Sequence, residues 1–136
     1  MSFTRRIVFL PPIFRFLMEL TAWTYFLILA FTVDIIFILG FILSVILLGL
    51  FNFPGDKKQN GPINVPGWMR ILNEWFSGGL LSIIGAFLLF QEVGAVMQFV
   101  LLLIVIIFDK DRYAWMLGLR ETAPEYVTIL RQVNRV

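Results

Sequence analysis

The sequence predicts an all-helical integral membrane protein: a bundle of four transmembrane helices made of two parallel repeats of a helical hairpin. Three observations predict this fold. Hydrophobic residues make up 60% of the 136 residues and charged residues only 15%, whereas soluble domains have about 45–50% apolar and about 25% charged residues. The apolar residues form two long blocks, and a short charged motif occurs once before or within each block.

The two apolar blocks cover residues 16–53 and 75–108. The first block contains two charged residues, Glu19 and Asp34, and the second block contains one, Glu92. A bilayer core of ~30 Å needs about 20 helical residues, so each block is nearly two spans long. Each block should therefore fold as a helical hairpin, which also satisfies the backbone hydrogen bonds that lipid cannot.

Polar residues place the turns of these hairpins at 32–34 and 91–94. The chain is then a single membrane domain over residues 1–136, with expected spans at about 13–33, 35–53, 69–90 and 93–108. The connector 54–68 is rich in proline and glycine, as polar loops are, and the tail 109–136 is polar again.

The basic residues predict the orientation. All eleven Lys and Arg lie in or beside the N-terminal segment, the connector or the tail, and the two outer turns carry none. With four spans, these three basic regions fall on one side, which the positive-inside rule makes cytoplasmic. Both termini are therefore expected in the cytoplasm.

The repeated motif is P-x3-R-x-L-x-E. Its four residues recur 55 positions apart, as Pro11, Arg15, Leu17 and Glu19 and then as Pro66, Arg70, Leu72 and Glu74. Because each unit holds two spans, both repeats insert in the same direction. A pseudo-twofold axis should then run along the membrane normal.

The arginine and glutamate of each motif are candidate site residues, because residues four apart share one helix face. A glutamate about one turn inside the membrane is costly without a partner. We therefore expect crossed pairing, Arg15 with Glu74 and Arg70 with Glu19. Three interpretations are open: a structural staple between spans one and three, a proton- or cation-coupled site on the two glutamates, or a binding site for lipid headgroups or a protein.

Other polar and small residues within the spans predict helix contacts. Asn73 and Gln98 are expected to form interhelical hydrogen bonds. Gly78, Ser82 and Ala86 form a stripe of small residues that lets helix backbones approach closely.

The tail carries a further candidate surface. Tyr126, Ile129, Leu130 and Val133 lie at helical spacing after Pro124, which suits a helix start. A short C-terminal amphipathic helix could lie on the membrane or dock a partner. A solvated tail is the alternative.

Three segments resemble the YrdB-like family of small four-span bacterial membrane proteins, whose function is not established. They are residues 14–20 (FRFLMEL), 48–51 (LGLF) and 66–74 (PGWMRILNE). The resemblance covers about residues 12–109 and implies a bacterial plasma (inner) membrane protein without adding a mechanism. Leu48, where the family has tryptophan, and Asn73, where it often has an apolar residue, depart from its pattern.

The absence of histidine and cysteine removes the commonest metal ligands and general bases, and no nucleotide loop or nucleophile–base pair is present. We expect no catalytic, cofactor-binding or metal-binding residue, no cofactor and no nucleic-acid partner. The predicted function is a non-enzymatic accessory, scaffolding or regulatory component of a membrane complex. Its expected partners are the lipid bilayer and a membrane protein or a second copy of the chain. The alternative is a small oligomeric proton- or cation-coupled transporter or channel using Glu19 and Glu74.

Overall fold

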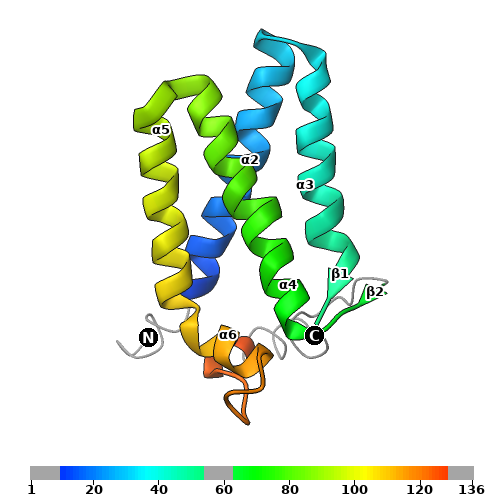
Figure 1. Cartoon of the computed structure of the whole chain (residues 1–136), viewed down its shortest axis with the longest axis vertical. Coiled ribbons are helices and arrows are strands. Elements are labelled where there is room, and N and C mark those ends of the chain that lie inside the picture. Colours follow the sequence, from blue (N-terminus) through cyan, green and yellow to red (C-terminus); the bar gives the residue numbers. More distant parts are fainter. Residues whose placement is uncertain (1–9, 54–62, 129–136) are drawn as a thin grey trace.

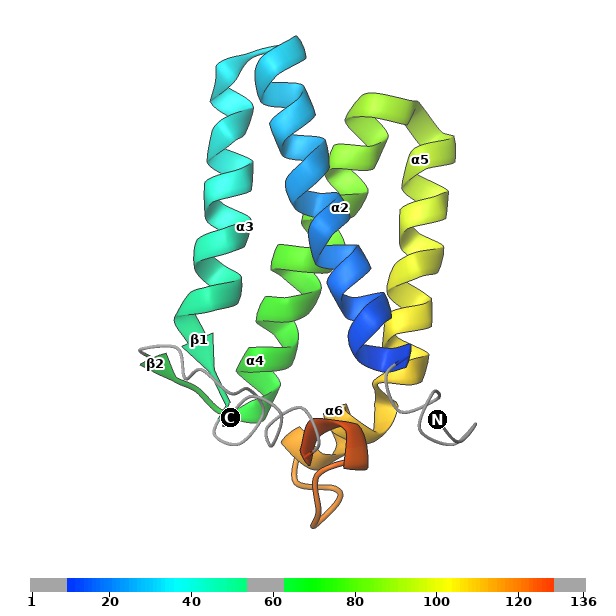
Figure 2. The same cartoon turned by 180° about the vertical axis from the view of Figure 1, so that it is seen from behind.

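The computed structural model describes residues 10–53 and 63–128, and in these residues the chain is helical apart from two very short strands. Figure 1 shows long helices running side by side along the longest axis, with a shorter helix and a loop gathered at one end. Figure 2 shows the same arrangement from behind.

The first hairpin consists of α2, Leu10–Thr32, and α3, Ile38–Leu50. The reversal between them lies at the turn that the sequence predicted. The side chain of Asp34 accepts a hydrogen bond of 2.9 Å from the backbone N–H of Ile36 and so caps a single 3₁₀ turn, Ile35–Phe37. This capping satisfies a backbone donor at the start of the new helix.

Two short parallel strands follow α3. Strand β1, Phe51–Asn52, pairs with β2, Ile63–Asn64, in the register Phe51 to Ile63. The end of α3 therefore differs from the predicted span, which ran to 53, because the backbone from Phe51 is extended and bonds to β2. This pairing places the end of α3 beside the start of α4 (Figure 1).

The second half of the chain is a long helical stretch that reverses once. It consists of α4, Gly67–Glu74, a π-helical segment, Trp75–Leu80, and α5, Leu81–Phe108. Within α5, Gln91 has φ 60° and ψ −148°, which is not helical. The chain turns back there, so that the two parts of α5 run antiparallel (Figure 1).

The π-helical segment lies immediately after Glu74. The N–H of Leu81 bonds to the carbonyl of Phe76, five residues earlier, where an α-helix would bond four residues earlier. The widened turn coincides with a side-chain contact: Ser44 on α3 donates a 2.6 Å hydrogen bond to the carbonyl of Ser77.

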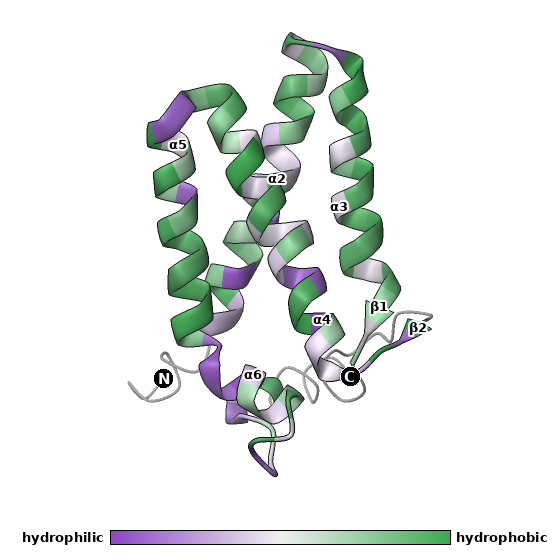
Figure 3. Cartoon of the chain, in the orientation of Figure 1, coloured by the Kyte–Doolittle hydropathy of each residue, from purple (hydrophilic) through white to green (hydrophobic). Residues whose placement is uncertain are grey.

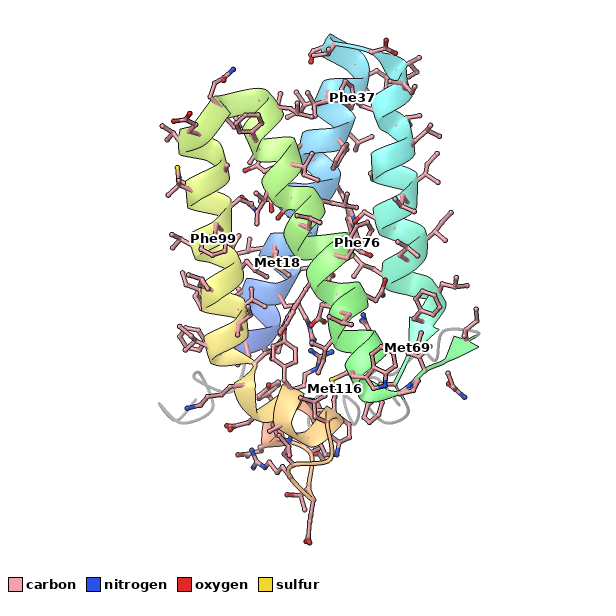
Figure 4. The ribbon with its side chains drawn as sticks, in the orientation of Figure 1. Met18, Phe37, Met69, Phe76, Phe99 and Met116 are labelled. Carbon is pink, nitrogen blue, oxygen red and sulfur yellow. The ribbon has the colours of Figure 1, made fainter. Side chains whose placement is uncertain are left out.

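Small side chains allow the helices to pack closely. Ala22 and Ala30 on α2 are buried, as are Ser82 and Ala86 on α5. Met18 points from α2 into the space between the helices (Figure 4) and is fully buried. Large apolar side chains remain exposed around the outside, and Figure 3 shows that hydrophobic residues predominate along the long helices.

Two of the helical stretches are long and apolar enough to cross a membrane. They are Pro11–Thr32, with 22 residues, and Gly67–Phe108, with 42 residues and the reversal at Gln91. The stretch Ile35–Leu50 is apolar but shorter.

After α5 the chain folds back under the helices. Helix α6, Lys110–Met116, lies at the end of the molecule where α4 begins. Residues 125–128 form one further helical turn, which starts where the amphipathic helix was predicted. Ile129, Leu130 and Val133 lie outside the described residues.

Candidate functional site

Five charged side chains meet at the end of the molecule where α4 begins. They are Arg15 on α2, Arg70 and Glu74 on α4, Asp109 after α5, and Arg112 on α6; we refer to them as the charge cluster. Arg15 is 14% exposed, and the other four are fully buried. Ion pairs at such depth stabilise a structure only when their geometry compensates for the cost of desolvation.

Glu74 lies at the centre of the charge cluster. Its Oε2 accepts a 3.1 Å hydrogen bond from Arg112 Nη1 and a 2.9 Å hydrogen bond from the Tyr113 hydroxyl. Its Oε1 lies 3.8 Å from Arg15 Nη1 and 4.0 Å from Arg70 Nη2. One carboxylate therefore holds together groups from α2, α4 and α6.

Asp109 is the second carboxylate of the charge cluster. Its Oδ1 accepts a 2.8 Å hydrogen bond from the Tyr126 hydroxyl, and its Oδ2 lies 3.4 Å from Arg112 Nη1 and 3.7 Å from Arg15 Nη1. Burial raises the pKa of Asp109 above its ordinary value, and the positive charges of Arg15 and Arg112 oppose this rise. Burial also raises the pKa of Tyr126, so this hydroxyl stays a donor.

The structure brings together three of the four charged residues that the repeated motif singled out. Arg15 and Glu74 approach each other across α2 and α4, as the crossed pairing predicted. Among the described residues, the carboxylate within ion-pair distance of Arg70 is Glu74, four residues along its own helix. Glu19 is half-buried on α2 and has interactions of its own. Of the two predicted crossed pairs, Arg15 with Glu74 is present, whereas Arg70 pairs with Glu74.

Asn73 belongs to a hydrogen-bonded network that joins α4 to α3. Its Nδ2 donates a 2.8 Å hydrogen bond to the carbonyl of Leu47, and its Oδ1 accepts one of 3.0 Å from Ser77. Ser44, which bonds to the Ser77 carbonyl, also accepts a 3.1 Å hydrogen bond from Trp23 Nε1 on α2. Interhelical bonds of this kind hold helices together in lipid.

Gln98 joins the second part of α5 to α2. Its Oε1 accepts a 3.4 Å hydrogen bond from the Tyr25 hydroxyl, and its Nε2 donates to Thr21 Oγ1. Thr21 in turn donates 2.8 Å to the carbonyl of Met18. Asn73 and Gln98 therefore both make the helix-to-helix hydrogen bonds expected of them.

Sequence reasoning missed three members of this site: Asp109, Arg112 and Tyr113. They stand directly after an apolar block and looked like the start of a solvated tail. The signal that could have found them is the spacing of Asp109 and Arg112, which places both on one face of a short helix at the end of the predicted span.

Tyr126, by contrast, was singled out as a docking residue, and it docks within its own chain. It is 8% exposed, and Val127 beside it is 3% exposed. The hydroxyl of Tyr126 reaches Asp109, so the last described turn is attached to the charge cluster.

The arrangement places three arginines around two carboxylates, so the charge cluster is only partly neutralised. In the described part of the chain, no group of three or more His, Cys, Asp or Glu residues is placed to hold a metal ion. No protein-family model matches the chain, and no curated protein or solved structure matches it either.

Proposed function

We propose that the chain is a non-enzymatic four-span membrane protein whose charge cluster is a clasp, and that it serves as an accessory or scaffolding component of a membrane complex. By a clasp we mean a set of ion pairs that ties helix ends together without doing chemistry. The observation that carries the proposal is the position of Glu74, fully buried between Arg15, Arg70 and Arg112.

Four spans are supported by the reversal at Gln91. The stretch Gly67–Phe108 has 42 residues, about twice what a bilayer needs, and the chain turns back inside it. Asp34 and Glu92 lie at the two reversals, whereas the charge cluster and Lys110 lie at the other end, where α6 begins. The positive-inside rule makes that end cytoplasmic, and the motifs that resemble the YrdB-like family favour a bacterial plasma membrane.

Two parallel repeats are supported by the order of packing. The second helix of each hairpin packs against the first helix of the other: α3 contacts α4 and the π-helical segment, and the second part of α5 bonds to α2 through Gln98. In Figures 1 and 2, α2 and α4 cross in the middle, with α3 and the second part of α5 on opposite sides. A twofold axis along the helices would exchange the two hairpins in this way.

A structural role for Glu74 is favoured over proton or cation coupling. A coupling carboxylate needs a path for water or ions, and intramembrane acids in transporters face such cavities. Glu74 is instead fully buried, with both hydrogen bonds to Oε2 coming from α6. Coupling at this residue would require α6 to move away.

The topology can be tested directly because the chain has no cysteine. Single cysteines replace Val33 and Val93 at the two tips, where these side chains are 67% and 69% exposed, and Lys110 at the other end. In right-side-out vesicles, a membrane-impermeant maleimide should label Val33→Cys and Val93→Cys but not Lys110→Cys. Inverted vesicles should give the reverse pattern. Labelling of the two tips from opposite sides would rule out four spans.

The accessory role is tested by purification from the native membrane in mild detergent. A membrane protein should co-purify in a fixed ratio with the wild-type chain. Recovery of the chain alone would count against this role. Proton or cation flux into proteoliposomes, lost in a well-folded Glu19→Gln variant, would favour the transporter instead.

A further inference from the structure

A pocket separate from the charge cluster lies beside the tail. It has a volume of about 330 Å³ and is lined by Pro11 at the start of α2, Phe108 at the end of α5, and Pro124 and Tyr126 of the tail. Small-molecule pockets measure about 300–1,000 Å³, so this one suits a headgroup and not a whole lipid. It lies where the apolar helices end.

The rim of the pocket is charged. Asp111, Arg120 and Glu125 also line it. Arg120 Nη1 and Asp111 Oδ2 lie 3.6 Å apart, and their side chains are 41% and 58% exposed. An ion pair this exposed is weak, so both groups remain able to turn toward a ligand. The rim thus offers one guanidinium and two carboxylates.

We propose that this pocket binds the headgroup of a zwitterionic phospholipid that carries a primary ammonium, as phosphatidylethanolamine does. Arg120 binds the phosphate, because guanidinium groups match phosphate oxygens. Asp111 and Glu125 accept hydrogen bonds from the ammonium. Phe108 and Pro11 contact the glycerol and the first methylene groups. The inference rests on the proposed membrane-spanning topology.

The surface beside the pocket is continuous with side chains that face lipid in this topology. Ile107 on α5 is 63% exposed, and Ile13 on α2 is 49% exposed. Acyl chains lying along these residues would bring a headgroup to the level of Phe108. A soluble cation could bind the carboxylates but would leave the apolar wall in water.

The charges of the rim select the headgroup. An anionic headgroup would meet Arg120 but also two carboxylates, which repel it. A choline headgroup has no N–H group to donate to Asp111 or Glu125. A primary ammonium beside a phosphate satisfies all three side chains at once.

The site also has a consequence for the clasp. Tyr126 forms part of the pocket wall, while its hydroxyl bonds to Asp109. A headgroup packed against Tyr126 would therefore hold the last described turn in place and stabilise the charge cluster from outside.

Native mass spectrometry of the full chain tests this proposal. The protein, purified in mild detergent, is mixed separately with phosphatidylethanolamine, phosphatidylcholine and phosphatidylglycerol of the same acyl chains. We expect phosphatidylethanolamine to be retained about two- to fivefold more than the other two, the range that a few exposed ion pairs provide. The double variant Asp111→Asn, Glu125→Gln should lose this preference.

Glu92→Gln is the matched control, since it removes an exposed carboxylate at the opposite end and should keep the preference. All variants are first checked for a single elution peak and unchanged helix content. The proposal would be overturned if the three lipids were retained equally, if phosphatidylglycerol were preferred, or if the preference survived in the double variant. A dimer of the chain without bound lipid would also overturn it. The cysteine labelling reports the topology separately, so a lost lipid preference with four spans intact removes only this site.

Discussion

Arg112 Nη1 lies 3.1 Å from Glu74 Oε2, closer than Arg15 or Arg70 comes to the same carboxylate in the contacts given above. The two residues come from elements that the sequence places in different regions, a tail and a span. The same Arg112 Nη1 is 3.4 Å from Asp109 Oδ2. The tail therefore takes part in the packing of the helices, and its loss should affect them.

Replacing Glu74 with glutamine should be strongly destabilising. It leaves Arg70 and Arg112 buried beside a neutral group, and breaking a buried ion pair costs about 3–5 kcal/mol. Arg15→Gln should cost less, because Arg15 is 14% exposed and its contacts are longer. Thermal unfolding in detergent, monitored by circular dichroism, measures the loss of stability in both variants. A larger loss for Arg15→Gln would contradict the central position of Glu74.

Exchanging the charges of Arg15 and Glu74 should not rescue stability. An arginine at position 74 would face Arg70 and Arg112, which are both within 4.0 Å of the present carboxylate. The double variant Arg15→Glu, Glu74→Arg should therefore unfold no later than the worse single variant. Rescue to the wild-type midpoint would mean that the two residues pair in isolation.

Removing the Tyr126 hydroxyl should release the tail. Tyr126→Phe loses the 2.8 Å hydrogen bond to Asp109, and such a bond contributes roughly 1–3 kcal/mol. Trypsin should then cleave faster after Arg120. Tyr25→Phe removes a phenol hydroxyl from the long helices and should leave the cleavage rate unchanged. Equal rates in all three proteins would show that the hydroxyl does not hold the tail.

The stability of the fold should depend on the protonation of Asp109. Its pKa is raised from 3.8 by burial, so the folded chain binds this proton more tightly than the unfolded chain. The stabilisation of the fold by the protonated Asp109 is then complete below pH 3.8 and is lost as the pH rises through the folded-state pKa. Arg15, Arg112, Glu74 and Tyr126 face this carboxyl group.

Asp109→Asn should remove this dependence. Relative to the wild type, the unfolding midpoint of the variant should improve as the pH rises from about 4 through the folded-state pKa of Asp109. Thermal unfolding in buffered detergent across this range checks it. A variant that becomes progressively less stable than the wild type as the pH rises would show that the charged carboxylate is favoured in the fold.

Gln91→Gly should stabilise the protein. Gln91 has φ 60° and ψ −148°, a region used almost only by glycine, and the strain costs about 1–3 kcal/mol. Glycine also makes the unfolded chain more flexible, which leaves a net gain of about 1 kcal/mol. Glu92→Gly, one residue on, should destabilise by about 0.5–1 kcal/mol. The two unfolding midpoints should therefore move in opposite directions, and a shift of both in one direction would contradict the strain at Gln91.

Gly67→Ala should separate α4 from α6. A Cβ atom at Gly67 would lie 1.8 Å from the carbonyl oxygen of Met116, a backbone atom that cannot turn aside. Overpacking of this kind costs roughly 1–3 kcal/mol. Gly49→Ala is the control: beyond its chain neighbours and its own helix backbone, a Cβ atom at Gly49 would meet no atom of the described residues within 4 Å, and alanine favours the helix by about 1 kcal/mol. Equal midpoints for the two variants would contradict the close approach of α4 and α6.

The helices and their reversals were predictable because they depend on composition and local signals. Two apolar blocks longer than one span and the polar residues Asp34 and Gln91 were sufficient to place both reversals. The interhelical bonds of Asn73 and Gln98 followed from the cost of an unpaired amide in an apolar span.

The partners within the charge cluster were only partly predictable. The motif identified Arg15 and Glu74, because a buried glutamate needs a cation. It could not show that α6 returns to the same place, since that depends on close packing of Gly67 against Met116. Arg112 was therefore missed, and with it the third arginine that contacts Glu74.

The π-helical segment between Glu74 and Leu81 sets the rotation of one half of this helical stretch against the other. Each helical residue turns the chain by about 100°. In a regular α-helix, the eight residues from Glu74 to Ser82 would therefore turn the chain by about 800°, which leaves the two side chains about 80° apart around the helix. The wider turns of the π-helical segment reduce this angle, so Glu74 and Ser82 both face inward. The segment thus keeps the clasp and the helix contacts in phase.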